Sequence, residues 1–93
     1  MSEKKLGDIL KNLYRDKGNK GPYYEAKIKA KWEEMFGPII IRYTSGIRLE
    51  NQTLFVKITS APLKNELAMG KEQILRTVNE SLGEAYVDKI VFL

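Results

Sequence analysis

Two short alternating segments joined by an Asn-Gln dipeptide at 51–52 constrain the fold more than any other feature of the chain. On both sides of the dipeptide, apolar residues alternate with polar ones, which is the period of a half-buried β-strand. A two-residue turn places Leu49 opposite Leu54 and Ile47 opposite Val56, so these four side chains share one face. Asparagine tolerates the positive φ that such a turn requires. The segment therefore predicts a β-hairpin with one buried face.

A long helix is predicted directly after the hairpin. Ser60 can cap its start, and Pro62 suits a first turn, where a missing N–H costs little. Gly70 lies on the apolar stripe of this helix at a cost of about 1 kcal/mol in helix propensity, so we expect it to approach the sheet closely. Gly83 is the expected C-terminal stop. The stripe consists of five residues at helical spacing, Leu63, Leu67, Ile74, Val78 and Leu82.

The rest of the chain contains three further predicted elements and one ambiguous segment. Amphipathic patterns predict a first helix over residues 2–17 and a second over 22–36, with Trp32 as a core anchor of the second. Residues 39–44 fit a strand by their β-branched side chains and a short helical continuation by the preceding proline. A last strand is predicted over residues 85–93.

The order of these elements predicts an α+β fold in a single domain over residues 1–93. Two N-terminal helices precede the hairpin, which is followed by the long helix and the final strand. A hairpin, a helix and a third strand make a three-stranded sheet with the long helix on one face.

Composition restricts the chemistry that this chain of 93 residues can perform. It contains neither cysteine nor histidine, which excludes Ser–His and Cys–His nucleophiles, histidine-liganded zinc, thiolate metal sites and disulfides. The sequence shows no carboxylate pair and no glycine-rich phosphate loop. We therefore expect a binding module without a catalytic site or a cofactor. The charged N-terminus and the lack of an apolar run near 20 residues favour a cytoplasmic location.

The net charge of +4 is concentrated in the N-terminal half. Between Lys4 and Lys31 the chain has nine basic residues and three acidic ones. Such an excess suggests an acidic partner, most often nucleic acid, and fits equally well a solvated lysine-rich helix surface. The candidate phosphate contacts lie outside the apolar stripes and are Lys17, Lys20, Lys27 and Lys31.

The outward face of the hairpin is a second candidate for binding nucleic acid. Arg48 is expected opposite Phe55, with Lys57 nearby. Cations around an exposed aromatic ring can hold nucleic acid, or they can form a cross-strand cation–π pair beneath another helix. The covered arrangement is somewhat favoured, because the two N-terminal helices must bury their stripes against something.

The ordered set of motifs resembles the bacterial DciA-like family. The family pattern runs from a tryptophan and a glycine five residues later, through a strand of the form L-x-V-x-V, to an N-x-x-L-G and a final V-x-x-I-x-F. A serine and an apolar–x–x–Glu–Leu run come between them. The matching positions, which span almost the whole chain, are Leu6, Asp8, Ile9, Leu10, Trp32, Gly37, Leu54, Val56, Ile58, Ser60, Leu63, Glu66, Leu67, Ile74, Leu75, Asn79, Leu82, Gly83, Val87, Ile90 and Phe92.

The resemblance implies a KH-like domain that binds DNA and engages the replicative DNA helicase. Two departures are visible: Leu63 stands where relatives often have an aromatic residue, and many relatives extend past the last strand in a basic tail. The leading hypothesis is a non-enzymatic accessory factor in DNA replication that binds single-stranded or forked DNA without sequence specificity and helps to load the helicase. No membrane or small-molecule partner is expected. The alternatives are an RNA-binding KH-like module and a protein–protein adaptor.

Overall fold

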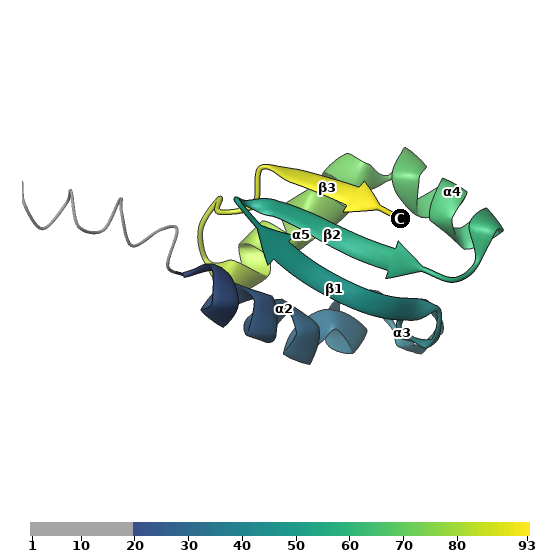
Figure 1. The fold of residues 1–93 in the computed structure, drawn as a ribbon, viewed down its shortest axis with the longest axis horizontal. Helices are drawn as coiled ribbons and strands as arrows, with labels where there is room; N and C mark the ends of the chain where they lie inside the picture. Colours follow the sequence, from purple (N-terminus) through teal and green to yellow (C-terminus); the bar gives the residue numbers. More distant parts are fainter. Residues whose placement is uncertain (1–19) are drawn as a thin grey trace, which may run out of the picture.

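The computed structural model describes residues 20–93, which form an α+β domain with a three-stranded sheet (Figure 1). This confirms the predicted fold class. The helix predicted over residues 2–17 lies outside the described residues. The elements in chain order are α2 (Gly21–Phe36), α3 (Pro38–Arg42), β1 (Thr44–Glu50), β2 (Thr53–Ile58), α4 (Ala61–Met69), α5 (Lys71–Leu82) and β3 (Lys89–Phe92).

The sheet contains the predicted hairpin in the predicted register. The strand order is β1-β2-β3, and β1 pairs with β2 antiparallel, with Leu49 opposite Leu54 and Ile47 opposite Val56. The two turn residues at 51 and 52 have φ of 48° and 65°, the left-handed conformation that a two-residue hairpin turn needs. β2 and β3 run parallel, so α4 and α5 together form the crossover that joins them.

Helix α2 confirms the predicted second helix and its apolar stripe. Tyr24, Ile28 and Trp32 are buried at successive turns, and Trp32 is only 1% exposed. The indole Nε1–H of Trp32 donates to Thr44 Oγ1 at 3.0 Å, and Thr44 Oγ1 donates to the Ile40 carbonyl at 2.7 Å. The tryptophan therefore fills the core and also joins α2 to the start of β1.

The ambiguous segment 39–44 divides between the two predicted alternatives. Residues 38–42 form the short helix α3, and the chain is already in β1 at Thr44. Gly37, at φ 94°, reverses the chain between α2 and α3. The Ile40 carbonyl accepts hydrogen bonds from Tyr43 N and Thr44 Oγ1, which close the last turn of α3. These tertiary and capping bonds outweigh the β propensity of the isoleucines.

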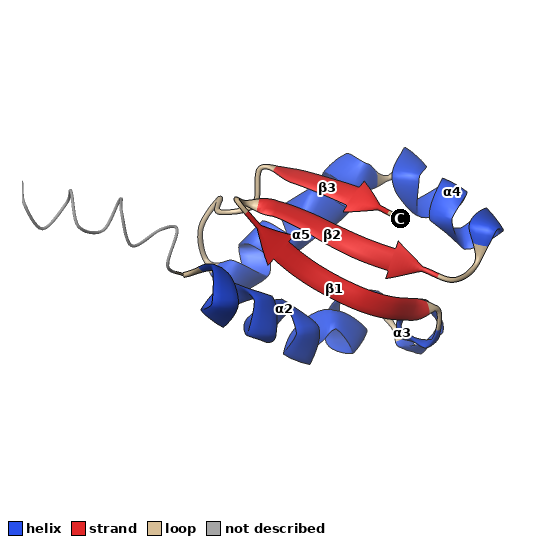
Figure 2. Ribbon diagram, in the orientation of Figure 1, coloured by secondary structure: helices blue, strands red, loops and turns tan. Residues whose placement is uncertain are grey.

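The prediction of one long helix after the hairpin is wrong, because α4 and α5 are separated at Gly70 (Figure 2). Gly70 has φ −106° and ends α4 as it begins α5. A Cβ built on Gly70 would meet nothing closer than the Leu67 carbonyl at 4.0 Å, so the expected close approach to the sheet is also wrong. The caps are confirmed: Ser60 Oγ accepts from Leu63 N at 3.3 Å, and Gly83 has φ 82°.

The last strand is shorter than predicted, since β3 covers only Lys89–Phe92. Tyr86 and Val87 are both buried, although they lie in the loop before the strand. Asn79 of α5 holds this loop, because its side-chain amide donates to the Val87 carbonyl at 3.0 Å and its carbonyl accepts from Val87 N at 2.9 Å. The segment predicted as one strand over residues 85–93 therefore consists of a packed loop followed by a short strand.

One hydrophobic core lies between the sheet and the helices, and α5 passes behind the strands in Figure 1. Helix α2 packs against this same core, so the expectation that it would cover the outward face of the hairpin is wrong. Within residues 20–93, no helix is long and apolar enough to span a membrane. The core consists of Tyr24, Ile28, Trp32, Ile47, Leu49, Leu54, Val56, Ile58, Leu67, Ile74, Val78, Leu82, Tyr86, Val87 and Ile90.

Candidate nucleic-acid interface

The second face of the sheet is not covered by any of the described helices, and we call it the open face. Because side chains alternate along a strand, the neighbours of the core residues point to this side. Arg48 pairs with Phe55, and Phe55 pairs with Val91, so the three form one row across the sheet. The side chains of the open face come from the three strands and from Leu93, which follows β3, and they are Arg48, Glu50, Thr53, Phe55, Lys57, Lys89, Val91 and Leu93.

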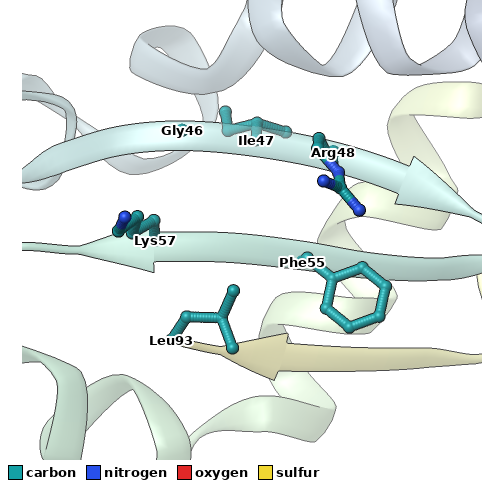
Figure 3. A pocket seen from close by; sticks show the side chains of 6 residues that line it. All are labelled: Gly46, Ile47, Arg48, Phe55, Lys57 and Leu93. Carbon is teal, nitrogen blue, oxygen red and sulfur yellow. The ribbon is translucent and has the colours of Figure 1, made fainter.

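Phe55 is half-buried at the centre of the open face, and the cation of Arg48 lies beside it (Figure 3). The Arg48 guanidinium carbon is 6.0 Å from the centre of the phenyl ring, at the outer limit of a cation–π contact. The same guanidinium forms an ion pair with Glu50 at 2.5 Å, and both side chains are more than half exposed. The predicted cross-strand pair is therefore present, without a described helix above it.

A hollow of about 370 Å³ lies on the open face next to Phe55. Lys57 stands opposite Gly46, whose missing side chain leaves space on the β1 side. Leu93 flanks Lys57 on the other side, because its backbone bonds to Val56 and Ile58 continue the β2–β3 ladder. The hollow thus combines an aromatic ring, an apolar wall and two cations, as Figure 3 shows.

The residues that the C-terminal end of the chain adds to this surface were not identified from the sequence, and they are Lys89, Val91 and Leu93. Their period-two spacing was a usable signal, because alternate residues of a strand share a face. The sequence did not show which strand β3 joins or in which direction it runs. Only the parallel pairing with β2 places Val91 beside Phe55 and Lys89 beside Thr53.

The basic residues predicted on the second helix lie away from the open face, on a separate flank of α2. Lys27 and Lys31 are four residues apart and half-buried, and the Lys27 ammonium is 6.0 Å from the centre of the Tyr23 ring. Lys20 instead forms an ion pair with Glu84 at 3.2 Å. Lys17 lies outside the described residues. The structure therefore gathers Arg48, Phe55 and Lys57 on one surface and leaves the lysines on another.

The start of α2 is fixed by a polar cluster around Glu84, in the loop before β3. The Tyr24 hydroxyl donates to Glu84 Oε2, which also receives the Lys20 ammonium. That hydrogen bond and burial raise the pKa of Tyr24 to about 12, and burial also raises the pKa of Tyr86. Both phenols are therefore neutral near pH 7. This cluster attaches α2 to the core and leaves Lys20 partly neutralised.

Glu25 protects part of the outer edge of β1. Its Oε1 accepts from Leu49 N at 2.9 Å, and its Oε2 is 3.2 Å from Lys29 Nζ. The hydrogen bond from the Leu49 backbone lowers the pKa of Glu25, with Lys29 contributing in the same direction against the effect of burial. An exposed strand edge can pair with another chain, so a carboxylate on one of its N–H groups restricts such pairing.

The described residues contain no group of three or more carboxylates that could hold a metal ion. Fold and surface together define a small α+β domain that presents a basic and aromatic sheet face. A family model described as "Dna[CI] antecedent, DciA" matches residues 5–92. The chain therefore belongs to the DciA family, whose role is the loading of the replicative helicase in DNA replication. A comparison with curated proteins found no significant match.

Proposed function

We propose that this protein is a non-enzymatic helicase loader of the cytoplasm that holds a single DNA strand on the open face. The observation that carries the proposal is the position of Phe55, half-buried and flanked by Arg48 and Lys57 with no described helix above it. An aromatic ring among cations on a sheet is a common platform for unpaired bases.

The chemistry of the open face matches an unpaired nucleotide better than a duplex. A base can stack on Phe55, while Lys57 and Lys89 neutralise the flanking phosphates. In a duplex the faces of the bases are already stacked on their neighbours, so the ring would gain little. The apolar neighbours Val91 and Leu93 offer no hydrogen-bonding side chain to a base edge. We therefore infer that binding is independent of sequence and favours single-stranded or forked DNA.

The flank of α2 supports this binding through phosphate contacts. Lys27 and Lys31 are neighbours on one side of the helix. Among residues 20–93, neither ammonium forms an ion pair with a carboxylate within 4.0 Å. Lys20 contributes less because its ammonium is already paired with Glu84. Lys17, which comes three residues earlier in the chain, is included as a further phosphate contact. Contacts of this kind position a strand without reading its sequence.

The first experiment measures the affinity of Phe55→Leu for a single-stranded oligonucleotide by fluorescence anisotropy. Leucine keeps the apolar bulk and removes the stacking surface, so affinity should fall by the equivalent of about 1–3 kcal/mol per stacked base. Tyr43→Leu is the matched control, because Tyr43 is an aromatic residue that is 37% exposed and belongs to neither surface proposed for DNA. Equal losses for the two variants, or no loss for Phe55→Leu, would contradict the proposed platform.

The second experiment compares double variants by the slope of log affinity against log salt. Lys57→Ala with Lys89→Ala should reduce the slope by about 0.7 per lost contact on single strands. Lys27→Ala with Lys31→Ala should do the same if the flank of α2 touches phosphates. Lys64→Ala with Arg76→Ala removes the same charge from α4 and α5 and should leave the slope unchanged. Equal slopes for all three variants would place the DNA elsewhere.

Two further measurements test the remaining parts of the proposal. Capture of the purified protein by the replicative helicase of the same organism, with nuclease added, would support a direct association. Titration with an RNA oligonucleotide of the same sequence tests the RNA-binding alternative. Equal or tighter binding of RNA, together with no capture by the helicase, would favour that alternative.

A further inference from the structure

The outer edge of β1 has one protected end and one end that is still able to pair. β1 is the first strand of the sheet, so its far side has no neighbouring strand among the described elements. Leu49 N points away from β2, toward Glu25. Alternate residues of an antiparallel strand point the same way, so Ile47 presents its own N–H and C=O at this edge. Glu25 closes the edge at Leu49 and leaves it open at Ile47.

A groove runs beside the open end of this edge. It has a volume of about 380 Å³, and its walls come from α2, α3 and the first half of β1. Ile41 forms one wall, and the chain after α3 is held in place because the Tyr43 carbonyl accepts from Thr59 N at 2.8 Å. Trp32 and Lys29 contribute from α2. The packing of α2, α3 and β1 therefore fixes the shape of the groove.

The surroundings of the groove are unusually apolar for a surface. Six large apolar side chains are exposed in the described part of the chain, and two of them are Ile41, which lines the groove, and Tyr43, which directly follows α3. Exposed apolar clusters of this kind mark contacts with proteins. Isoleucines offer nothing to a phosphate backbone, so this surface suits a polypeptide better than DNA.

The charges at the groove restrict which polypeptide fits. Lys29 lines the groove from α2, where it is paired with Glu25 at 3.2 Å, and Arg48 lines it from β1, where it is paired with Glu50. Arg42 is exposed on α3, and no carboxylate side chain lines the groove. An occupant with an acidic residue near Lys29 and an apolar residue against Ile41 would complement both. An extended segment could also exchange backbone hydrogen bonds with Ile47, which is the mode of strand addition to a sheet edge.

We propose that this groove binds an extended, acidic segment of the replicative helicase as an added strand beside β1. The inference rests on the proposed association with the helicase and names the surface that carries it. DNA and helicase would then occupy different sides of β1, with the strand on the open face and the partner segment at the edge. The groove and the hollow of the open face share Gly46, Ile47 and Arg48, so the two ligands would meet along β1.

The test compares Ile41→Asp with Ile39→Asp in binding to the purified helicase. The two substitutions make the same change two residues apart on α3, but only Ile41 lines the groove, whereas Ile39 is 65% exposed outside it. Ile41→Asp should weaken helicase binding by about tenfold or more, as expected of a central interface residue. Ile39→Asp should bind like the wild type, and both should keep their affinity for single-stranded DNA.

Deuterium exchange on the wild-type complex provides a second readout that does not depend on any variant. Helicase should slow exchange at the Ile47 amide, because strand addition pairs that N–H. Unchanged exchange there, or equal helicase affinity for the two variants, would overturn the inference while leaving the association intact. Failure of the wild type to bind helicase would overturn the proposed association itself. If Ile41→Asp does not fold by circular dichroism, Ile41→Ser replaces it.

Discussion

The two faces of the sheet differ in burial and in the type of side chain, although the same strands form both. Leu54 and Val56 of β2 are fully buried under the helices, whereas Phe55 and Lys57 between them lie on the open face. The covered face is almost entirely aliphatic, while the open face mixes one aromatic ring, two apolar side chains and three cations with Glu50 and Thr53. Adjacent residues of one strand therefore lie in turn on the covered face and on the open face.

This separation has a physical origin in the way a small domain is stabilised. A chain of 93 residues can bury one modest core, and here a single hydrophobic cluster uses the helices on one side of the sheet. The opposite face, which no described helix covers, then carries the polar and aromatic residues to which the proposed function assigns binding. Substitutions on the two faces should consequently affect different measurements.

The largest expected effect is on the covered face, at Trp32. Trp32→Ala should reduce the free energy of unfolding by about 3–5 kcal/mol, because it leaves a cavity and removes the bond to Thr44. Urea unfolding followed by circular dichroism measures this. If the variant keeps its stability but loses DNA binding, Trp32 belongs to the binding surface. That result would contradict the assignment of stability to the covered face and of binding to the open face.

Neighbouring residues of β2 provide the most direct comparison. Leu54→Ala should cost about 2–5 kcal/mol of stability, whereas Phe55→Leu should cost less than about 1.5 kcal/mol. The order is reversed for the affinity for DNA. Phe55→Leu should weaken DNA binding, whereas Leu54→Ala should leave it unchanged as long as the variant folds. Urea unfolding and fluorescence anisotropy, each measured on both variants, test these two orders. Parallel losses in both measurements for both variants would mean that the two faces are coupled.

Glu25, at the edge between the two faces, should make a contribution that depends on pH. Its folded-state pKa is lowered, so the ionised carboxylate stabilises the fold above its ordinary value of 4.5. This stabilisation is lost as the pH falls through the folded-state pKa. Glu25→Gln should therefore lower the melting temperature more at pH 7 than at pH 3. Equal shifts at both values would show that the charge is not involved.

The smallest effect is expected at Gly70, which contacts neither face. The open space beside its Cα and its φ of −106° allow an L side chain without strain. Gly70→Ala should therefore leave stability unchanged or raise it by about 0.4–1 kcal/mol, by restricting the unfolded chain. Thermal unfolding measures the change. A loss above about 1 kcal/mol would restore the expectation that this position packs tightly.

Several parts of the fold and the candidate site were predictable because they depend on local rules. The hairpin register follows from alternation and the turn at 51–52, and it places Arg48 opposite Phe55 without further information. The Ser60 cap and the Gly83 stop follow from backbone chemistry. The buried stripe of α2 follows from helical spacing.

Other parts depended on contacts between distant segments. Asn79 belongs to a family motif, but its role appears only when its amide meets both backbone groups of Val87. The break at Gly70 and the short α3 likewise result from packing and capping that override local propensity. The sequence favoured a helix over the outward face of the hairpin, whereas α2 packs on the core side of the sheet.

The sequence by itself determined the hairpin, its register, the α+β class and the absence of histidine and cysteine chemistry, because alternation, turn geometry and composition are local properties. Only the tertiary structure decided that β3 joins β2 in parallel and that α2 packs on the same side as α5. Those two arrangements depend on how separate apolar surfaces share one core. They assemble the open face, and with it the surface on which the proposed function depends.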